Sequence, residues 1–135
     1  MAQTKKKISR SQPGIDKEGR QNLDYIKENS EFFEKKDGYQ NFGDTDIIRM
    51  AVALTIKKNL TLKEHPTAVG KNAGGSAWQK SQLETTPSLT QMVEIMVPQE
   101  QREDVWIYIE QAAITGLEYL KECVKKGKTF SEIME

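Results

Sequence analysis

The 135-residue sequence is poor in the residues from which most catalytic and structural sites are built. It has one cysteine and one histidine, which excludes an internal disulfide and a structural zinc site supplied by this chain alone. No apolar run approaches the roughly 18 to 20 residues of a membrane span. The lysine-rich first residues lack the apolar stretch of a secretory signal. We therefore expect no membrane span, no metal and no cofactor.

The chain also has no net charge at neutral pH, because 20 basic side chains balance 20 acidic ones. This balance excludes a globally basic nucleic-acid-binding protein and an acidic disordered chain. The charges are nevertheless unevenly distributed: residues 1–80 carry 15 basic and 10 acidic side chains, and residues 81–135 carry 5 and 10. Such segregation favours head-to-tail self-association or docking on a charged partner protein.

The first twelve residues contain a cluster of cations without any acid. The cluster consists of Lys5, Lys6, Lys7 and Arg10. Pro13-Gly14 follows as a turn or breaker signal, so we expect residues 1–14 to form a flexible basic tail. The tail is either a solvated chain end or an arm that contacts phosphate groups or an acidic protein surface.

Hydrophobic periodicity predicts an all-α fold, with a single domain of four to five helices over residues 15–135. The first helix is predicted over residues 16–33, with Asp16 as its N-cap and Leu23 and Ile26 on its apolar face. Basic residues and a glycine at 35–38 are typical of a helix end.

The strongest predicted element is a helix over residues 44–58, capped by Asp44. Eight of the ten residues from Ile47 to Ile56 are apolar, which implies burial on several sides. A buried strand is the competing interpretation, because this stretch contains β-branched residues. Length and the capping residue favour a helix, which we expect to be the central one.

The C-terminal part of the chain predicts three further helices. The first begins after the N-cap Ser88, and Met96 falls on its apolar face with Leu89 and Val93; Pro98 ends it. A long amphipathic helix is predicted over residues 99–124. Thr129 begins a last helical turn, because Glu132 three residues later completes a capping box.

Residues 59–87 form a predicted irregular, glycine-rich insert. They show no sustained period, and three glycines and two prolines interrupt them. Trp78 is the exceptional residue in this segment, because a large aromatic side chain in such a loop usually packs the loop onto the core. The alternative interpretation is that Trp78 binds a ligand.

The residues that could act in catalysis or bind phosphate lack the features that these roles require. His65 has no evident partner for acid–base work, and Cys123 lies at the wrong helix end for a lowered thiol pKa. The glycine-rich stretch KNAGGSAW at 71–78 lacks the spacing of a phosphate-binding loop. We therefore predict no catalytic residues and expect a protein that is not an enzyme.

Two kinds of binding function remain. The first is DNA or RNA contact through the basic tail, supported by further lysines at 57, 58, 63, 71 and 80. No predicted helix is rich in the Arg, Asn and Gln side chains that read base edges. The second is a protein-binding adaptor.

One stretch resembles a known family. Residues 42–59, with Phe42, Asp44 and the run Ala51-Val52-Ala53-Leu54 followed by basic residues, are similar to small bacterial proteins associated with DNA phosphorothioation, the accessory members of dnd-type gene clusters. The resemblance implies a cytoplasmic accessory protein of a prokaryotic DNA-modification or anti-phage defence system. It implies no catalytic residues. The sequence interpretation is thus an accessory protein acting through protein contacts, with a small DNA-binding regulator as the alternative.

Overall fold

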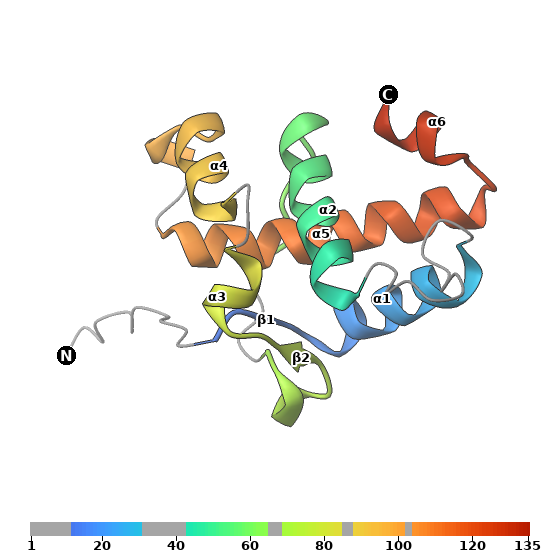
Figure 1. Ribbon diagram of the computed structural model, residues 1–135, viewed down its shortest axis with the longest axis horizontal. Helices are drawn as coiled ribbons and strands as arrows, with labels where there is room; N and C mark the ends of the chain where they lie inside the picture. Colours follow the sequence, from blue (N-terminus) through green and yellow to red (C-terminus); the bar gives the residue numbers. More distant parts are fainter. Residues whose placement is uncertain (1–11, 31–42, 65–68, 85–87, 102–103) are drawn as a thin grey trace.

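The structure is a computed structural model that describes residues 12–30, 43–64, 69–84, 88–101 and 104–135 (Figure 1). Lys5, Lys6, Lys7, Arg10 and His65 lie outside the described residues. The described elements, in chain order, are β1 (Gly14–Ile15), α1 (Lys17–Asn29), α2 (Asp44–Lys57), η2 (Lys71–Ala73), β2 (Ser76–Ala77), α3 (Lys80–Leu83), α4 (Leu89–Met96), η3 (Gln99–Gln101), α5 (Val105–Lys125) and α6 (Phe130–Met134). The predicted all-α fold is confirmed, with one two-residue strand pair that was not predicted.

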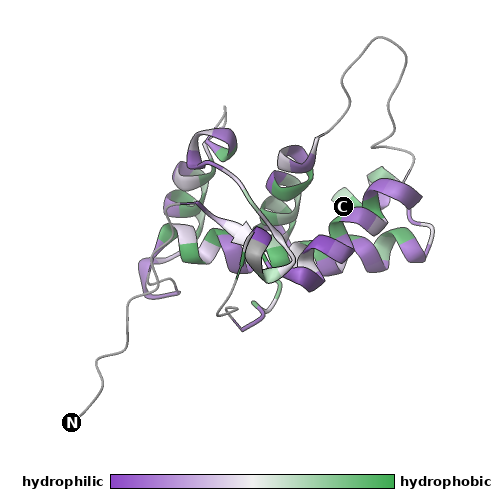
Figure 2. Cartoon of the chain, turned by 90° about the horizontal axis from the view of Figure 1, so that it is seen from below, coloured by the Kyte–Doolittle hydropathy of each residue, from purple (hydrophilic) through white to green (hydrophobic). Residues whose placement is uncertain are grey.

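The long helix α5 is the centre of the fold. Helices α1, α2 and α4 all pack against it (Figure 1), and its side chains Ile109, Leu117 and Leu120 are fully buried. The expectation that the helix at 44–58 is central was wrong, because 21 residues give α5 the length to contact every large helix. In Figure 2 the helices carry both hydrophilic and hydrophobic residues, as expected for helices with one buried face.

Helices α2 and α5 cross at unusually short range. Gly116 of α5 lies against the backbone of Ala51, so that a Cβ atom at position 116 would overlap the Ala51 carbonyl oxygen. The Thr55 hydroxyl lies 2.9 Å from the Ala51 oxygen and 2.8 Å from the Ala112 oxygen. The Thr55 hydroxyl therefore donates to carbonyl groups of both α2 and α5, and this shared hydrogen bond fixes the relative position of the two helices.

Several helix ends differ from the prediction. Helix α1 has the predicted N-cap Asp16, which accepts a hydrogen bond from the Gly19 N–H, but it ends at Asn29 because Ser30 is extended. The N-cap of α2 is Gly43 rather than Asp44. Helix α5 begins only at Val105, after the separate short helix η3.

Asp44 does not cap its own helix because its carboxylate binds α1 instead. It accepts hydrogen bonds from Lys27 at 2.7 Å and from Arg20 at 2.8 Å. Arg20 also donates to Asp24 and to the Ser76 hydroxyl, so the cluster joins α1, α2 and β2. Burial opposes the charge of Asp44, but the hydrogen bonds from Lys27 and Arg20 and their positive charges outweigh burial and lower the pKa of Asp44.

We predict that Asp44→Asn lowers the free energy of unfolding by about 1 to 2 kcal/mol at neutral pH. The folded-state pKa of Asp44 lies below its ordinary value of 3.8. The carboxylate therefore stabilises the fold fully above this ordinary value, and the contribution is lost as the pH falls through the lower folded-state pKa. Urea unfolding in a series of buffers from neutral pH to well below 3.8 measures the difference. Glu28→Gln, at an exposed position of α1, is the control, and an Asp44→Asn effect that persists in strong acid would contradict the prediction.

The described part of the predicted insert is docked on the domain. Gly14 pairs with Ala77 and Ile15 pairs with Ser76 in an antiparallel ladder. At Gly75 a Cβ atom would overlap the Ile15 carbonyl oxygen, so only glycine allows this approach. Trp78 is half-buried against the core, and its backbone N–H donates to the Pro13 carbonyl at 3.0 Å. The prediction that Trp78 packs this segment onto the core is confirmed.

Candidate interaction surfaces

Two of the predicted binding lysines that the structure describes, Lys63 and Lys80, make separate intramolecular contacts. The tail cluster Lys5, Lys6, Lys7 and Arg10 lies outside the described residues. Lys63 pairs with Glu18 and Glu118, and these pairings raise the pKa of Lys63, with the Glu118 hydrogen bond as the largest cause. Lys80 lies over the Trp106 ring, 5.4 Å from its centroid. The charges of these lysines are therefore committed to intramolecular contacts in separate parts of the fold.

The remaining chemical candidates do not form a site either. Cys123 is buried in the core, at 3% exposure. Within the described ranges, no three His, Cys, Asp or Glu side chains are placed to hold a metal ion. Among the same residues, no helix has the length and apolar content needed to cross a membrane.

Helix α4 carries two large apolar side chains that the fold leaves in solvent. Ile95 is 80% exposed and Met96 is 59% exposed, whereas Leu89 and Val93 of the same helix are buried. Met96 was predicted to face the core, and this prediction was wrong. We call the exposed pair Ile95 and Met96, with the residues around it, the α4 surface.

Side-chain hydrogen bonds stabilise the N-terminal end of α4, the helix that carries the α4 surface. Ser88 caps the helix as predicted, accepting from the Gln91 N–H. The Glu84 carboxylate accepts further hydrogen bonds from the Ser88 hydroxyl at 2.6 Å and from the Thr90 hydroxyl at 2.7 Å. Burial opposes the charge of Glu84, but these hydrogen bonds outweigh it, so the pKa of this carboxyl lies below its ordinary value. These hydrogen bonds connect the start of α4 to Glu84.

Three acidic side chains lie close to the exposed pair in the sequence. Glu94, Glu100 and Asp104 are all exposed, and among residues 88–101 and 104 the structure describes no basic side chain. Asp104 is held in place as the N-cap of α5, accepting from the Trp106 N–H at 2.8 Å. The described charged residues nearest to the apolar pair in the sequence are thus all acidic.

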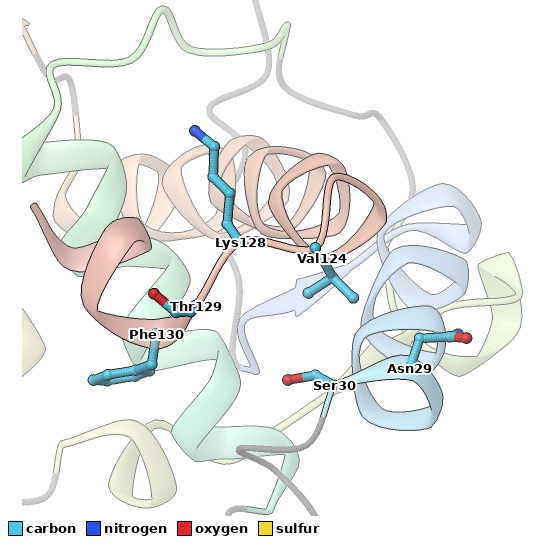
Figure 3. Close-up of a pocket in the computed structure, with 7 residues that line it drawn as sticks. Asn29, Ser30, Val124, Lys128, Thr129 and Phe130 are labelled. Carbon is cyan, nitrogen blue, oxygen red and sulfur yellow. The ribbon is translucent and has the colours of Figure 1, made fainter.

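A pocket of about 390 Å³ lies between the end of α1 and the connection from α5 to α6. We call it the α6 pocket. Its lining residues are Asn29, Ser30, Val124, Gly127, Lys128, Thr129 and Phe130. Figure 3 shows the Ser30 hydroxyl pointing from the end of α1 toward the α5–α6 connection, whereas the Lys128 side chain points outward. Ser30 is 3% exposed, and its hydroxyl has no hydrogen-bond partner among the described residues.

Charges of both signs lie near the α6 pocket: Lys128 lines it, and the Glu132 carboxylate accepts from the N–H of the lining residue Thr129 at 3.0 Å. The last turn of α5 and the residues after it supply Lys125, Lys126 and Lys128. Lys121 and Lys125 also lie over the Tyr25 ring, at 5.8 and 6.0 Å from its centroid, and such contacts hold a cation beside an aromatic face. The predicted capping box of Thr129 and Glu132 is present and orients α6 next to the pocket.

The two surfaces lie at opposite ends of the molecule. Helix α4 packs near the beginning of α5, and α6 follows its end (Figure 1). One end carries the exposed apolar pair Ile95 and Met96, and the other carries the α6 pocket. Comparisons of the chain with protein-family models, with curated proteins and with solved structures found no match.

Sequence reasoning missed both surfaces, although one signal was present for the first. The run Ile95-Met96-Val97 places three large apolar side chains in succession at the end of a two-turn helix. Successive helical residues point about 100° apart, so one packed face cannot bury all three. No comparable signal marks the α6 pocket, because Ser30 and Val124 are 94 positions apart in the sequence.

Proposed function

We propose that this chain is a non-enzymatic adaptor that acts through protein contacts, with the α4 surface as its docking site. The observation that carries the proposal is the exposure of Ile95 and Met96 side by side, at 80% and 59%. Large apolar side chains exposed together on an otherwise packed helix are typical of a protein interaction site. Burial of each such side chain contributes roughly 1.5 to 3 kcal/mol.

The charges near the apolar pair in the sequence indicate what kind of partner fits. Because Glu94 directly precedes the pair and Glu100 and Asp104 follow it, all three exposed, the complementary surface is apolar with lysine or arginine beside it. The resemblance of residues 42–59 to accessory proteins of DNA phosphorothioation supports a place for the adaptor in a prokaryotic DNA-modification or anti-phage defence system.

The docking site is tested with the double variant Ile95→Asp, Met96→Asp. Both side chains are exposed, so the variant should fold with the wild-type thermal midpoint and bind its partner at least tenfold more weakly. The matched control is Gln91→Asp, which adds a charge at another exposed position of the same helix. The tagged proteins are captured from the native host and the recovered partners are quantified by mass spectrometry. Equal recovery of every partner by the wild type and the double variant would contradict the proposal.

A further inference from the structure

We infer that the chain carries a peptide-binding groove, and that its own residues 13–15 occupy this groove as an intramolecular ligand. We call residues 13–15 the strap. The groove is formed by residues 70–78 and by the buried side chains next to them, and Figure 1 shows the two paired strands β1 and β2 side by side. The partner that fits the groove is an extended peptide in which a glycine precedes a large aliphatic residue. This site is separate from the α4 surface, so the inference goes beyond the proposed function.

The groove holds the strap through backbone hydrogen bonds, as it would hold any extended peptide. The Trp78 N–H donates to the Pro13 carbonyl at 3.0 Å, and the Gly70 N–H donates to the Ile15 carbonyl at 3.1 Å. The strap also pairs with β2 in the antiparallel ladder. Addition of an extended segment to a strand edge is a recurrent mode of peptide recognition, in which backbone groups give affinity and side-chain sites give specificity.

Two positions of the strap are selective. At Gly14 a Cβ atom would lie 2.6 Å from the Ser76 carbonyl oxygen, so the groove excludes a side chain at this position. The next residue, Ile15, is 1% exposed and belongs to the hydrophobic core. The groove therefore selects a glycine followed by a large aliphatic residue.

A buried carboxylate adds a third contact to the strap. Glu110 of α5 is 1% exposed, and its Oε2 atom accepts a hydrogen bond from the Gly14 N–H at 2.9 Å. A carboxylate is costly to bury, and well-packed apolar residues often stabilise a core more than buried charges do. We therefore assign Glu110 a recognition role: it binds the backbone N–H of the glycine that enters the groove.

The strap does not fill the groove. A cavity of about 10 Å³ remains beside it, with Ile48, Leu83 and Ile109 in its walls. The position of the strap is also constrained by α1, because Asp16, the residue after the strap, is the N-cap of that helix. A free peptide lacks this constraint and can use the remaining space.

The strap is thus a tethered competitor of any free peptide. Tethering gives it a high effective concentration at the groove, so the wild-type chain should bind a free peptide only weakly. A chain whose strap is disabled should bind the same peptide well.

The test uses the full chain with the strap disabled in two ways. Gly14→Val places a side chain against the Ser76 carbonyl, and Ile15→Ala removes most of the buried aliphatic side chain. The probe is a synthetic peptide of residues 12–17, with the sequence QPGIDK, and the control peptide carries Gly14→Val. Gly43→Val is the control protein, because a Cβ atom there meets no atom within 4 Å. Titration calorimetry measures binding, and circular dichroism measures folding.

We expect both strap variants to fold and to bind the probe about tenfold or more tightly than the wild type and Gly43→Val do. The control peptide should not bind any of the four proteins. Adding Glu110→Leu to Ile15→Ala should weaken binding of the probe, because the acceptor for the glycine N–H is then missing.

Folded strap variants that bind the probe no better than the wild type would overturn the inference, and so would equal binding of the control peptide. Unfolding of both strap variants would also overturn it, because it would show that residues 13–15 are an inseparable part of the core. The α4 docking site is tested independently, since the strap variants leave Ile95 and Met96 unchanged.

Discussion

Replacement of Gly116 by leucine should leave the domain unfolded or nearly so at room temperature. A Cβ atom at this position would overlap the Ala51 carbonyl oxygen and lie 2.5 Å from the Ala51 carbonyl carbon. The obstructing atoms are backbone, so no side-chain rotation can relieve the overlap. Helix α2 would have to move away from α5, which would disrupt the Thr55 hydrogen bonds to Ala51 and Ala112 and the packing of the fully buried Ile48 and Val52.

The expected cost exceeds the roughly 1 to 3 kcal/mol of ordinary overpacking and is a large share of the roughly 5 to 15 kcal/mol that stabilises a typical domain. Gly43→Ser is the matched control, because a side chain at this N-cap meets no atom within 4 Å and serine is a preferred cap. Urea unfolding followed by far-UV circular dichroism compares the two variants. A Gly116→Leu protein with the wild-type urea midpoint would show that α2 and α5 do not cross at this glycine.

Gly116 also shows the limit of reading this fold from the sequence. The helical period around it predicted an amphipathic helix, and α5 is one. The hydrophobic period of a helix, however, indicates only which of its faces is buried. It does not indicate which residue of another helix that face contacts. Ala51 and Gly116 are 65 positions apart, and the choice of glycine becomes intelligible only when the two backbones are seen in contact.

The correctly predicted features depend on short-range interactions. Asp16, Ser88 and Thr129 each accept a hydrogen bond from an N–H three residues later, so residue type and spacing are sufficient to identify them. Asp44 was wrongly predicted as a cap because its real partners, Arg20 and Lys27, are 24 and 17 residues away. The same reasoning explains why the β1–β2 pair was not predicted: 61 positions separate Ile15 from its partner Ser76.

The candidate surfaces were even less predictable than the fold. The exposed surface consists of the side chains that the core does not bury. The sequence shows which residues are apolar, but tertiary packing decides which of them are buried. Met92 and Met96 share one helical face in the sequence pattern, yet Met92 is partly buried against the core and Met96 is 59% exposed. The helical period therefore does not decide which of the two methionines the core covers.

Leu54→Asp should be the most damaging single substitution in the apolar stretch of α2. Leu54 is fully buried, at 0% exposure, and so are Ile47, Ala51 and Val52 on the same helix. A carboxylate at this position would lose its hydration in apolar surroundings, so folding must either bury the charge or protonate it. We expect a loss of several kcal/mol at neutral pH, enough to unfold much of the protein at 37 °C.

Leu54→Met is the matched control, because it keeps the volume and the apolar character of the site and should cost less than about 1.5 kcal/mol. The two variants separate the effect of charge from the effect of shape. Burial raises the pKa of a carboxyl group, so the penalty of Leu54→Asp should shrink as the pH falls and the unfolded chain is protonated as well. Thermal unfolding at neutral and at acidic pH measures both effects. A Leu54→Asp protein that melts at the wild-type temperature at neutral pH would place this face of α2 in solvent and remove the basis for its packing against α5.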